Sequence, residues 1–544
     1  MSRTAVMDDS DDTLDSLSNE PEAPLLPIAK QPHVPRPKAV ARWLVRRPLG
    51  ILRWARRHPR AFFLRLLLYI LYALLALLVI TPVVFPSYHS PPARYSDLRA
   101  RCRAADDGCA NPRIEKVFIA VSLYDPDGSL AGGAWGRAVV DLITVLGEDN
   151  VFLSIYENDS GEDGQRALRE LEARVRSRKS IVADMEPVRY EEYPHVTMPG
   201  GERVLKRLAY LTEVRNRAFK PIDRFRPPSG NGTDSSNGGG EDAVMEFDKV
   251  LFLSDALFDP IDAANLLFST NADESGRARY LSACAVDYNQ NPLLFYDLYA
   301  QRDSEGYSNG VPLFPYFPAE GSAESRRAML SETDAVPVKS CWGGMVAAQA
   351  AHFQNLEEEI PHPDWYRPAH HVVDPESPRN ASAPVRFRYE PEVFFDACEC
   401  CLLQADLRTV AEGSSDPHAE TGVFVNPYVR VAYSERVLSL VPVVMRFERL
   451  FAPVQRLAGA LAGLPTRNPH RTVRQGETFL EEVFNSKGEW EVVQRTGRNG
   501  MFCGVREMQT IVMGKREEGG KGEGLVNWVS WDVPWRDQQF DFPT

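Results

Sequence analysis

The run Lys116-Val-Phe-Ile-Ala-Val-Ser-Leu123 decides the fold class of this chain. It is a short, nearly uninterrupted apolar stretch, which is typical of a strand buried on both faces of a parallel sheet. A helical pattern follows over 135–146, and Gly147 is placed to end that helix in a left-handed conformation. The next apolar run covers 151–156. Strand, helix and strand in this order predict a parallel α/β unit.

The same alternation continues to about residue 280, beyond which the pattern loosens. Asp262 is predicted to cap the N-terminus of a short helix that follows a buried strand. The further predicted elements are strands at 180–184 and 247–254, helices from about 163 and over 202–219 and 263–268, and an amphipathic helix over 440–464.

Residues 66–85 are twenty residues without a charge, close to the length that crosses a bilayer as a helix. A buried core helix is the alternative, but soluble helices this apolar are usually shorter. Eight arginines lie between 42 and 65, whereas only Arg94 and Arg99 lie in the first fifteen residues after the stretch. The positive-inside rule therefore predicts a cytoplasmic N-terminus. A cleaved signal peptide is not expected because the stretch begins far from the N-terminus.

Charge is distributed unevenly along the 544 residues, which carry a net charge of -13. Residues 1–65 hold 12 Lys/Arg against 7 Asp/Glu, a balance of +5, so the remainder carries -18. An acidic main domain argues against nucleic-acid binding. The expected organisation is a disordered cytoplasmic tail at 1–65, a signal anchor at 66–85, a luminal stem at 86–114, a catalytic domain at 115–440 with a flexible insert at 229–242, and a C-terminal extension at 441–544 that packs on the catalytic domain.

Three Asn-x-Ser/Thr sequons, at Asn158, Asn231 and Asn380, follow the predicted anchor, and no sequon precedes it. Glycosylation is possible only on the luminal side, so their distribution supports the predicted orientation. We expect these three asparagines to be glycosylated.

All eight cysteines also follow the predicted anchor, in a compartment where disulfides persist. Cys102 and Cys109 bracket a short polar loop and are the expected local pair. A zinc site at Cys398, Cys400 and Cys401 is a competing interpretation, although no second cluster at ligand spacing accompanies it.

Polar side chains follow the predicted strands, at the edge where a doubly wound sheet binds its ligands. Asp255 follows the strand at 247–254, and Glu157 follows the strand at 151–156. A carboxylate such as Asp255 suits a divalent cation on a diphosphate, and Arg215 suits the diphosphate itself. The alternatives are a turn cap for Asp255 and a solvated helix face for Arg215. No Gly-x-Gly-x-x-Gly, Walker or Gly-x-Ser-x-Gly motif appears.

An ordered series of sequence blocks between about 115 and 435 resembles the fungal glycosyltransferase family 69, the α-1,3-mannosyltransferases and capsule-associated proteins. The blocks are Val117-Phe-Ile-Ala120, Phe152-Leu-Ser-Ile-Tyr-Glu157, Tyr210-Leu-Thr-Glu-Val-Arg-Asn-Arg217, Val250-Leu-Phe-Leu-Ser-Asp-Ala256, Cys284-Ala-Val-Asp287, Phe295-Tyr-Asp297 with Arg302-Asp303, Val338-Lys-Ser-Cys-Trp-Gly-Gly344, Phe387-Arg388, Glu399-Cys-Cys401 and Asn426-Pro-Tyr-Val-Arg430.

This resemblance implies a GT-A-like, doubly wound, mostly parallel α/β sheet behind a single transmembrane helix. It implies a type II Golgi membrane enzyme that moves mannose from GDP-mannose to a glycan acceptor with retention, using Mn²⁺ or Mg²⁺. The sequence departs from the usual Asp-x-Asp pattern because Ser254-Asp255-Ala256 has one carboxylate. The family pattern tolerates this, with Asn rather than Ser before the Asp.

The candidate site residues fall into three roles. We expect Asp255, as the metal ligand, Glu399 and Asp396 to be catalytic, with the latter two on the acceptor side. The predicted nucleotide-sugar contacts are Glu157, Arg215, Asn216, Asp287, Arg302 and Trp342; Trp342 is equally compatible with plain core packing. A catalytically inactive luminal scaffold for polysaccharide or capsule synthesis is the alternative function, against which the intact Arg215, Asp255 and Glu399 argue.

Overall fold

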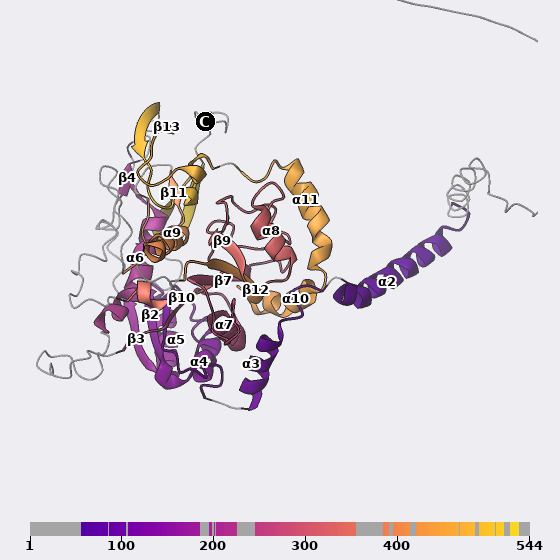
Figure 1. Ribbon diagram of the computed structural model, residues 1–544, viewed down its shortest axis with the longest axis horizontal. Helices are drawn as coiled ribbons and strands as arrows, with labels where there is room; N and C mark the ends of the chain where they lie inside the picture. The colour runs from indigo at the N-terminus through magenta and orange to yellow at the C-terminus, as the bar shows by residue number, and fades with distance from the viewer. Residues whose placement is uncertain are drawn as a thin grey trace, which may run out of the picture. The chain divides into compact units, whose positions relative to one another are not determined.

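The computed structural model of this chain forms an α/β domain preceded by one long helix (Figure 1). It divides into two units, 1–75 and 76–544, of which each is described by itself. The residues that the structure describes are 56–84, 86–104, 107–184, 195–197, 201, 203–225, 245–354, 384–390, 395–413, 420–466, 468–484, 489–505, 507–515 and 523–532. The predicted tail up to residue 55, the insert at 229–242 and the sequons at Asn231 and Asn380 lie outside them.

A nine-stranded mixed sheet is the centre of the domain. The pairings of its strands show that β3, β2, β1, β6, β7 and β12 run in one direction, while β10 and β9 run in the opposite one. The predicted mostly parallel α/β class is therefore confirmed. In spatial order the strands are β3 (Arg178–Asp184), β2 (Val151–Asn158), β1 (Val117–Leu123), β6 (Lys249–Leu253), β10 (Met345–Gln349), β7 (Ser282–Tyr288), β12 (Val423–Ala432), β9 (Val336–Ser340) and β8 (Arg302–Asp303).

Side-chain alternation along β1 divides the core into two layers. Ile119 packs with the helices on one face, and Phe118 packs with those on the other, as the period of two in a strand requires. Both faces are therefore covered, which explains why β1 is apolar at nearly every position. The first face carries α4 (Ala134–Leu146), α5 (Gly161–Arg174) and α7 (Pro260–Phe268), and the second carries α6 (Arg207–Phe219) and α9 (Glu399–Glu412).

The start of α7 differs from the prediction by one turn. The side chain of Asp259, rather than Asp262, caps the helix by accepting hydrogen bonds from the amides of Ile261 and Asp262. Pro260 occupies the first helical turn, where its missing N–H costs nothing. Asp262 therefore lies inside the helix and is available to other partners.

One helix among the described residues, α2 (Pro59–Val84), is long and apolar enough to cross a membrane. It includes 66–84 of the predicted span. Its most apolar part has a mean hydropathy of 2.6, and its side chains there are exposed. Such exposure of a continuous apolar surface is unfavourable in water and is what a bilayer helix presents to lipid.

The segment expected to be a stem is packed on the domain instead. Helix α3 (Ala93–Ala104) contacts α7, and Arg99 of α3 forms ion pairs with Asp259 at 2.9 Å and Asp262 at 2.7 Å. Tyr95 is buried and donates a hydrogen bond to Asp334. The stem prediction is therefore wrong for 86–104, because its polar composition reflects pairing with distant acidic residues rather than exposure to solvent.

The C-terminal extension also packs on the sheet domain. The predicted helix over 440–464 is broken into three pieces, α10 (Glu435–Met445), the 3-10 turn η8 (Glu448–Phe451) and α11 (Ala452–Leu461). Further along, β11 (Asp396–Ala397) pairs with β15 (Gly504–Val505). The extension also forms two antiparallel hairpins. One pairs β13 (Thr478–Phe484) with β14 (Trp490–Thr496), and the other pairs β16 (Glu507–Lys515) with β17 (Glu523–Asp532).

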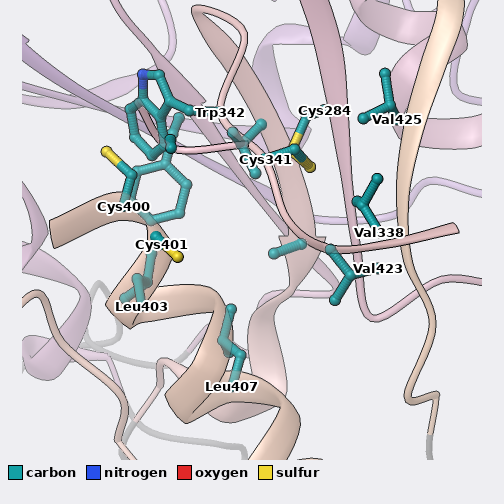
Figure 2. Packing of buried hydrophobic residues seen from close by; sticks show 14 of the residues in the cluster. Cys284, Val338, Cys341, Trp342, Cys400, Cys401, Leu403, Leu407, Val423 and Val425 are labelled. Carbon is teal, nitrogen blue, oxygen red and sulfur yellow. A yellow bond between two sulfur atoms is a disulfide. The ribbon is translucent and has the colours of Figure 1, made fainter. Parts of the chain in front are cut away.

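Three disulfides connect these parts. Cys102 and Cys109 are joined at the end of α3. Cys284 of β7 is bonded to Cys341 in the loop before β10, as Figure 2 shows. Cys401 of α9 is bonded to Cys503, across 102 positions of sequence, and this ties the C-terminal extension to the helix that covers the sheet. Cys401 is therefore not available as a zinc ligand.

Candidate functional site

The topology brings three strand ends and one loop to the same edge of the sheet. Strands β6, β7 and β12 are parallel in direction, so their carboxyl ends lie together, and β10 runs against them, so its amino end lies there too. Asp255 follows β6, Asp287 lies near the end of β7, Tyr433 follows β12, and the loop 341–344 precedes β10. Ser254 is fixed at this edge because its amide and hydroxyl both donate to the carbonyl of Gly344.

Asp255 is the exposed carboxylate of this edge. Among the described residues, no side chain donates a hydrogen bond to Asp255, so its oxygens remain available to a ligand. Solvent reaches the side chain, yet loss of hydration to the surrounding protein raises the pKa of Asp255, which the charge of Arg215 partly opposes. A carboxylate that is incompletely hydrated and open on one side fits a hard divalent cation.

The same edge carries two interacting carboxylates, Asp287, which is buried, and Asp297, which is partly buried. The amide of Asp297 donates to Asp287 at 3.0 Å, and the hydroxyl of Tyr433 donates to the other oxygen of Asp287 at 3.2 Å. Asp297 in turn accepts from the amides of Ala300 and Gly343. Burial and the mutual repulsion of the pair raise the pKa of Asp287, and burial raises that of Asp297. The pair therefore holds a proton more readily than two separate carboxylates.

Arg215 of α6 reaches the same edge from the other side. Its guanidinium forms an ion pair with Glu399 at 2.8 Å, donates to the sulfur of Cys400 and stacks 4.4 Å from the centre of the Trp342 ring. Burial alone would lower the pKa of Arg215, but the neighbouring acidic groups Cys400 and Glu399 raise it. Arg215 is thus a permanent cation, and its charge acts on both Asp255 and Asp297.

Glu399 and Trp342 are placed with Arg215 rather than on an open surface. Glu399 is buried at the start of α9, where the helix N-terminus and the ion pair with Arg215 stabilise its negative charge. Trp342 is 8% exposed, with Arg215 over its ring and Phe252 and Phe387 beside it. Figure 2 shows Trp342 and Cys400 among the side chains of one buried cluster. This packing leaves the indole little area on which a sugar ring could stack.

Two predicted nucleotide contacts have structural partners that use their polar groups. The Asn216 side chain both donates to and accepts from the backbone of Phe387 at 2.9 and 3.0 Å. Arg302 is buried and donates to four backbone carbonyls, those of Tyr299, Gln301, Phe502 and Cys503. The structure therefore assigns Asn216 and Arg302 to holding neighbouring segments, not to an open ligand site.

Asp396, predicted on the acceptor side, lies in a buried ion pair. Its carboxylate is 2.6 Å from the ammonium of Lys206, and it accepts from the amide of Gln509 at 2.8 Å. Lys206 also donates to the carbonyls of Glu390 and Phe395. A carboxylate that is fully buried and neutralised in this way is not placed to activate an acceptor hydroxyl.

Glu157 and Asn158 end β2 and are both buried. Glu157 accepts from the amide of Ser160 at 2.6 Å, so it shapes the loop after the strand. The side-chain amide of Asn158 donates to the hydroxyl of Tyr210 at 2.8 Å. A glycan on that nitrogen would have to replace this contact and enter the protein interior, so the folded domain does not accommodate glycosylation at Asn158.

Three residues of the site are missing from the sequence-based set. Tyr433 bonds Asp287, the ring of Tyr296 meets that of Tyr433 at 5.2 Å and is 52% exposed, and the amide of Gly343 bonds Asp297. Tyr296 and Gly343 lie inside quoted sequence blocks, whereas Tyr433 lies just past the last one. The strand order that joins β12 to β7 is the information that would have identified Tyr433.

Two other features of the described residues could hold a ligand, one beside Arg215 and one away from this edge. Cys398, Glu399 and Cys400 lie close enough to share a metal ion, but Arg215 already places a positive charge against two of them, which disfavours a cation. A pocket of about 320 Å³ lies between α3 and α7, and none of the predicted site residues lines it.

Comparison with solved structures finds distant likenesses among sugar-transferring enzymes. The mannosyltransferase PcManGT from Pyrobaculum calidifontis, solved with GDP-Man and Mn²⁺, is 13% identical, with 74% of this chain and 77% of that one covered and a TM-score of 0.29. Glucosyl-3-phosphoglycerate synthase from Mycobacterium tuberculosis is 12% identical (76% and 96% covered, TM-score 0.26). Mannosyl-3-phosphoglycerate synthase from Rubrobacter xylanophilus is 13% identical (76% and 91%, TM-score 0.26).

No curated protein matches the sequence significantly. A model of one protein family does match, and it covers the segment that contains β1, β6, β7 and the start of α9, including Asp255, Asp287 and Glu399. The matched residues are 116–406 of 544, more than half of the chain, and the chain therefore belongs to the family described as Cryptococcal mannosyltransferase 1.

Proposed function

We propose that this chain is a type II Golgi membrane enzyme that transfers mannose from GDP-mannose to a glycan acceptor, with α-1,3 specificity and retention. Membership of a mannosyltransferase family supports sugar transfer. The observation that carries the proposal is the exposed carboxylate of Asp255 beside the permanent cation Arg215, at the carboxyl edge of the sheet. One group suits a metal, and the other supplies positive charge.

Asp255 is the residue that would hold a divalent cation, Mn²⁺ or Mg²⁺, because its oxygens are the ones open to a ligand. When bound, such a cation neutralises the negative charge that develops on a departing diphosphate. Arg215 adds a fixed positive field at the same edge, which stabilises negative charge without contacting it. The raised pKa of Asp287 favours a shared proton on the Asp287–Asp297 pair, which would limit the negative charge at this edge, and Tyr433 orients Asp287.

The exposed Tyr296 ring is the aromatic surface that we assign to donor or acceptor contact, in place of Trp342. It lies against Tyr433 and presents its remaining area to solvent. An aromatic face beside carboxylates is a common means of binding a sugar or a base.

A ligand panel tests the proposal. Purified full-length protein is heated with Mn²⁺, Mg²⁺ and EDTA, each with GDP, UDP or no nucleotide, and transfer is assayed with GDP-mannose and UDP-glucose. We expect GDP with Mn²⁺ to raise the melting temperature most and GDP-mannose to be the better donor. A protein that responds to no nucleotide would instead be the inactive scaffold.

A further inference from the structure

Helix α11 (Ala452–Leu461) buries a polar side chain and exposes apolar ones. Its inward positions are Gln455, which is 1% exposed and bonds Arg326 and the carbonyl of Phe317, and the buried Gly459. Its outward positions are apolar, with Leu457 63% and Leu461 81% exposed. A helix of a water-soluble surface shows the reverse pattern.

The exposed apolar residues continue over the neighbouring elements with helical spacing. Leu450 of η8 precedes Val454, Leu457 and Leu461 at intervals of four, three and four, which places them on one stripe. Leu440 and Val443 of α10 are exposed three positions apart. We call this set the apolar ridge, and its residues are Leu440, Val443, Leu450, Val454, Leu457 and Leu461.

Arginines outnumber carboxylates among the exposed residues of the helices that carry the apolar ridge, in a chain that is acidic as a whole. The exposed charged residues of α10, α11 and the residue after α10 are Arg436, Arg446 and Arg456 against Glu435. This excess of cations contrasts with the net charge of -13. Apolar residues flanked by arginines match the interface between lipid headgroups and acyl chains, where arginine side chains reach phosphate groups.

The chain that leaves α2 is fixed against the middle of the apolar ridge. Ser87, fully buried, donates a hydrogen bond to Glu448 of η8, which joins α10 to α11. Tyr88 is buried beside it and bonds the carbonyl of Met329. Ser87 lies only three positions after Val84, the end of α2, so these two residues are at most about 11 Å apart. Arg430 holds Glu448 in place at 2.8 Å.

From this tether we propose that the apolar ridge lies in the headgroup region of the same membrane leaflet from which α2 emerges. The inference rests on α2 being the membrane anchor. The short connection holds η8 within reach of the bilayer surface, so a phospholipid surface is the partner that the ridge meets first. Because α10 begins two residues after Tyr433, this contact also sets the height of the site above the membrane.

The test uses the full chain reconstituted in phosphatidylcholine vesicles, with an NBD fluorophore on Leu457→Cys. Glu170→Cys, at an exposed position of α5, is the matched control, and wild-type protein reports any labelling of the buried Cys398 and Cys400. Emission is measured with and without lipids that carry a quencher near the headgroup. Flotation of the vesicles with the protein separately tests the anchor itself.

We expect the label at position 457 to emit at shorter wavelength than the label at 170 and to be quenched several-fold more strongly by the modified lipid. Emission and quenching equal to those at 170, in protein that floats with the vesicles, overturn the proposal. A shift to shorter wavelength that grows with protein density and ignores the modified lipid assigns the ridge to a second copy of the chain, and this also overturns it. Protein that does not float refutes the anchor, and with it the ridge proposal that rests on the anchor.

Discussion

At the scale of single residues, the site depends on which carboxylates are open and which are already paired. Asp255, Asp287, Glu399 and Asp396 look alike in sequence, because each is an acidic residue beside an apolar run. The structure separates them by their partners: Asp396 has Lys206, Glu399 has Arg215, and Asp287 has Tyr433. Those partners lie far away along the chain, so the local sequence pattern could identify the candidate carboxylates but could not show which of them is open to a ligand.

Asp255→Asn tests the residue that remains open. The substitution preserves shape and removes the charge, so we expect transfer to fall about 100-fold or more, since each 1.36 kcal/mol of lost stabilisation is about tenfold in rate. The melting temperature without metal should be unchanged, and the additional stabilisation by Mn²⁺ should disappear. Asp396→Asn is a contrasting variant, expected to lower stability because it leaves Lys206 buried without its charge partner. Full activity of Asp255→Asn would remove this residue from the site.

Asp287 makes a prediction about pH. The pKa of Asp287 is raised in the folded protein, so the folded protein retains a proton that the unfolded chain loses above about pH 4. The free energy of unfolding that this group contributes therefore falls as pH rises toward the folded pKa. Asp287→Asn cannot lose that proton. We therefore expect the melting temperature of the wild type to decline more steeply than that of the variant between about pH 5 and about pH 8. Parallel curves would show that the pair does not retain a proton.

At the scale of elements, sequence pattern locates the first half of the sheet and loses the second. Strands β1, β2 and β6 are apolar runs, and each was predicted within a few residues. Strand β7 contains small and polar residues, and β12 includes Pro427 with a register shift between Val425 and Arg430, so neither has the pattern of a buried strand. These two segments form strands because they pair with neighbouring strands that are distant in sequence, and such pairing cannot be read from a local sequence pattern.

The loop before β10 allows a matched pair of glycine substitutions. Gly343 has φ +57°, and a Cβ there would lie 2.0 Å from the carbonyl oxygen of Ala285. Gly463 has a similar φ of +65° but open space around it. Gly463→Ala should therefore cost about 1 kcal/mol of unfolding free energy from backbone strain alone.

Gly343→Ala adds a collision with the backbone of β7, and it displaces the amide that bonds Asp297. We expect its stability loss to exceed that of Gly463→Ala by at least about 1 kcal/mol, with activity reduced as well. Denaturant unfolding and transfer assays of both variants provide the measurement. Equal losses in the two variants would mean that the loop yields without disturbing the site.

At the scale of the whole molecule, local composition misleads where distant segments pair. The segment after the predicted anchor looks like a stem because of its paired prolines, but its Arg94 and Arg99 form ion pairs with Asp334, Asp259 and Asp262 of the domain. The consequence is functional. If α2 is the membrane anchor, a domain fixed three residues after it stays close to the bilayer, and we expect the acceptor to be held near the membrane.

Membrane orientation is the last prediction, and it uses the buried Asn158 as an internal control. If the N-terminus is cytoplasmic, protease added to intact microsomes should digest the tail at 1–65 and leave the domain after α2 protected. Endoglycosidase should reduce the mass of the protected fragment. Asn158 is buried against Tyr210, so Asn158→Gln should leave that mass change unaltered, whereas Asn231→Gln and Asn380→Gln together should abolish it. The expected orientation follows from the arginines before α2, since lysine and arginine are retained on the cytoplasmic side. A protected tail with a digested domain would show that the chain has the opposite orientation.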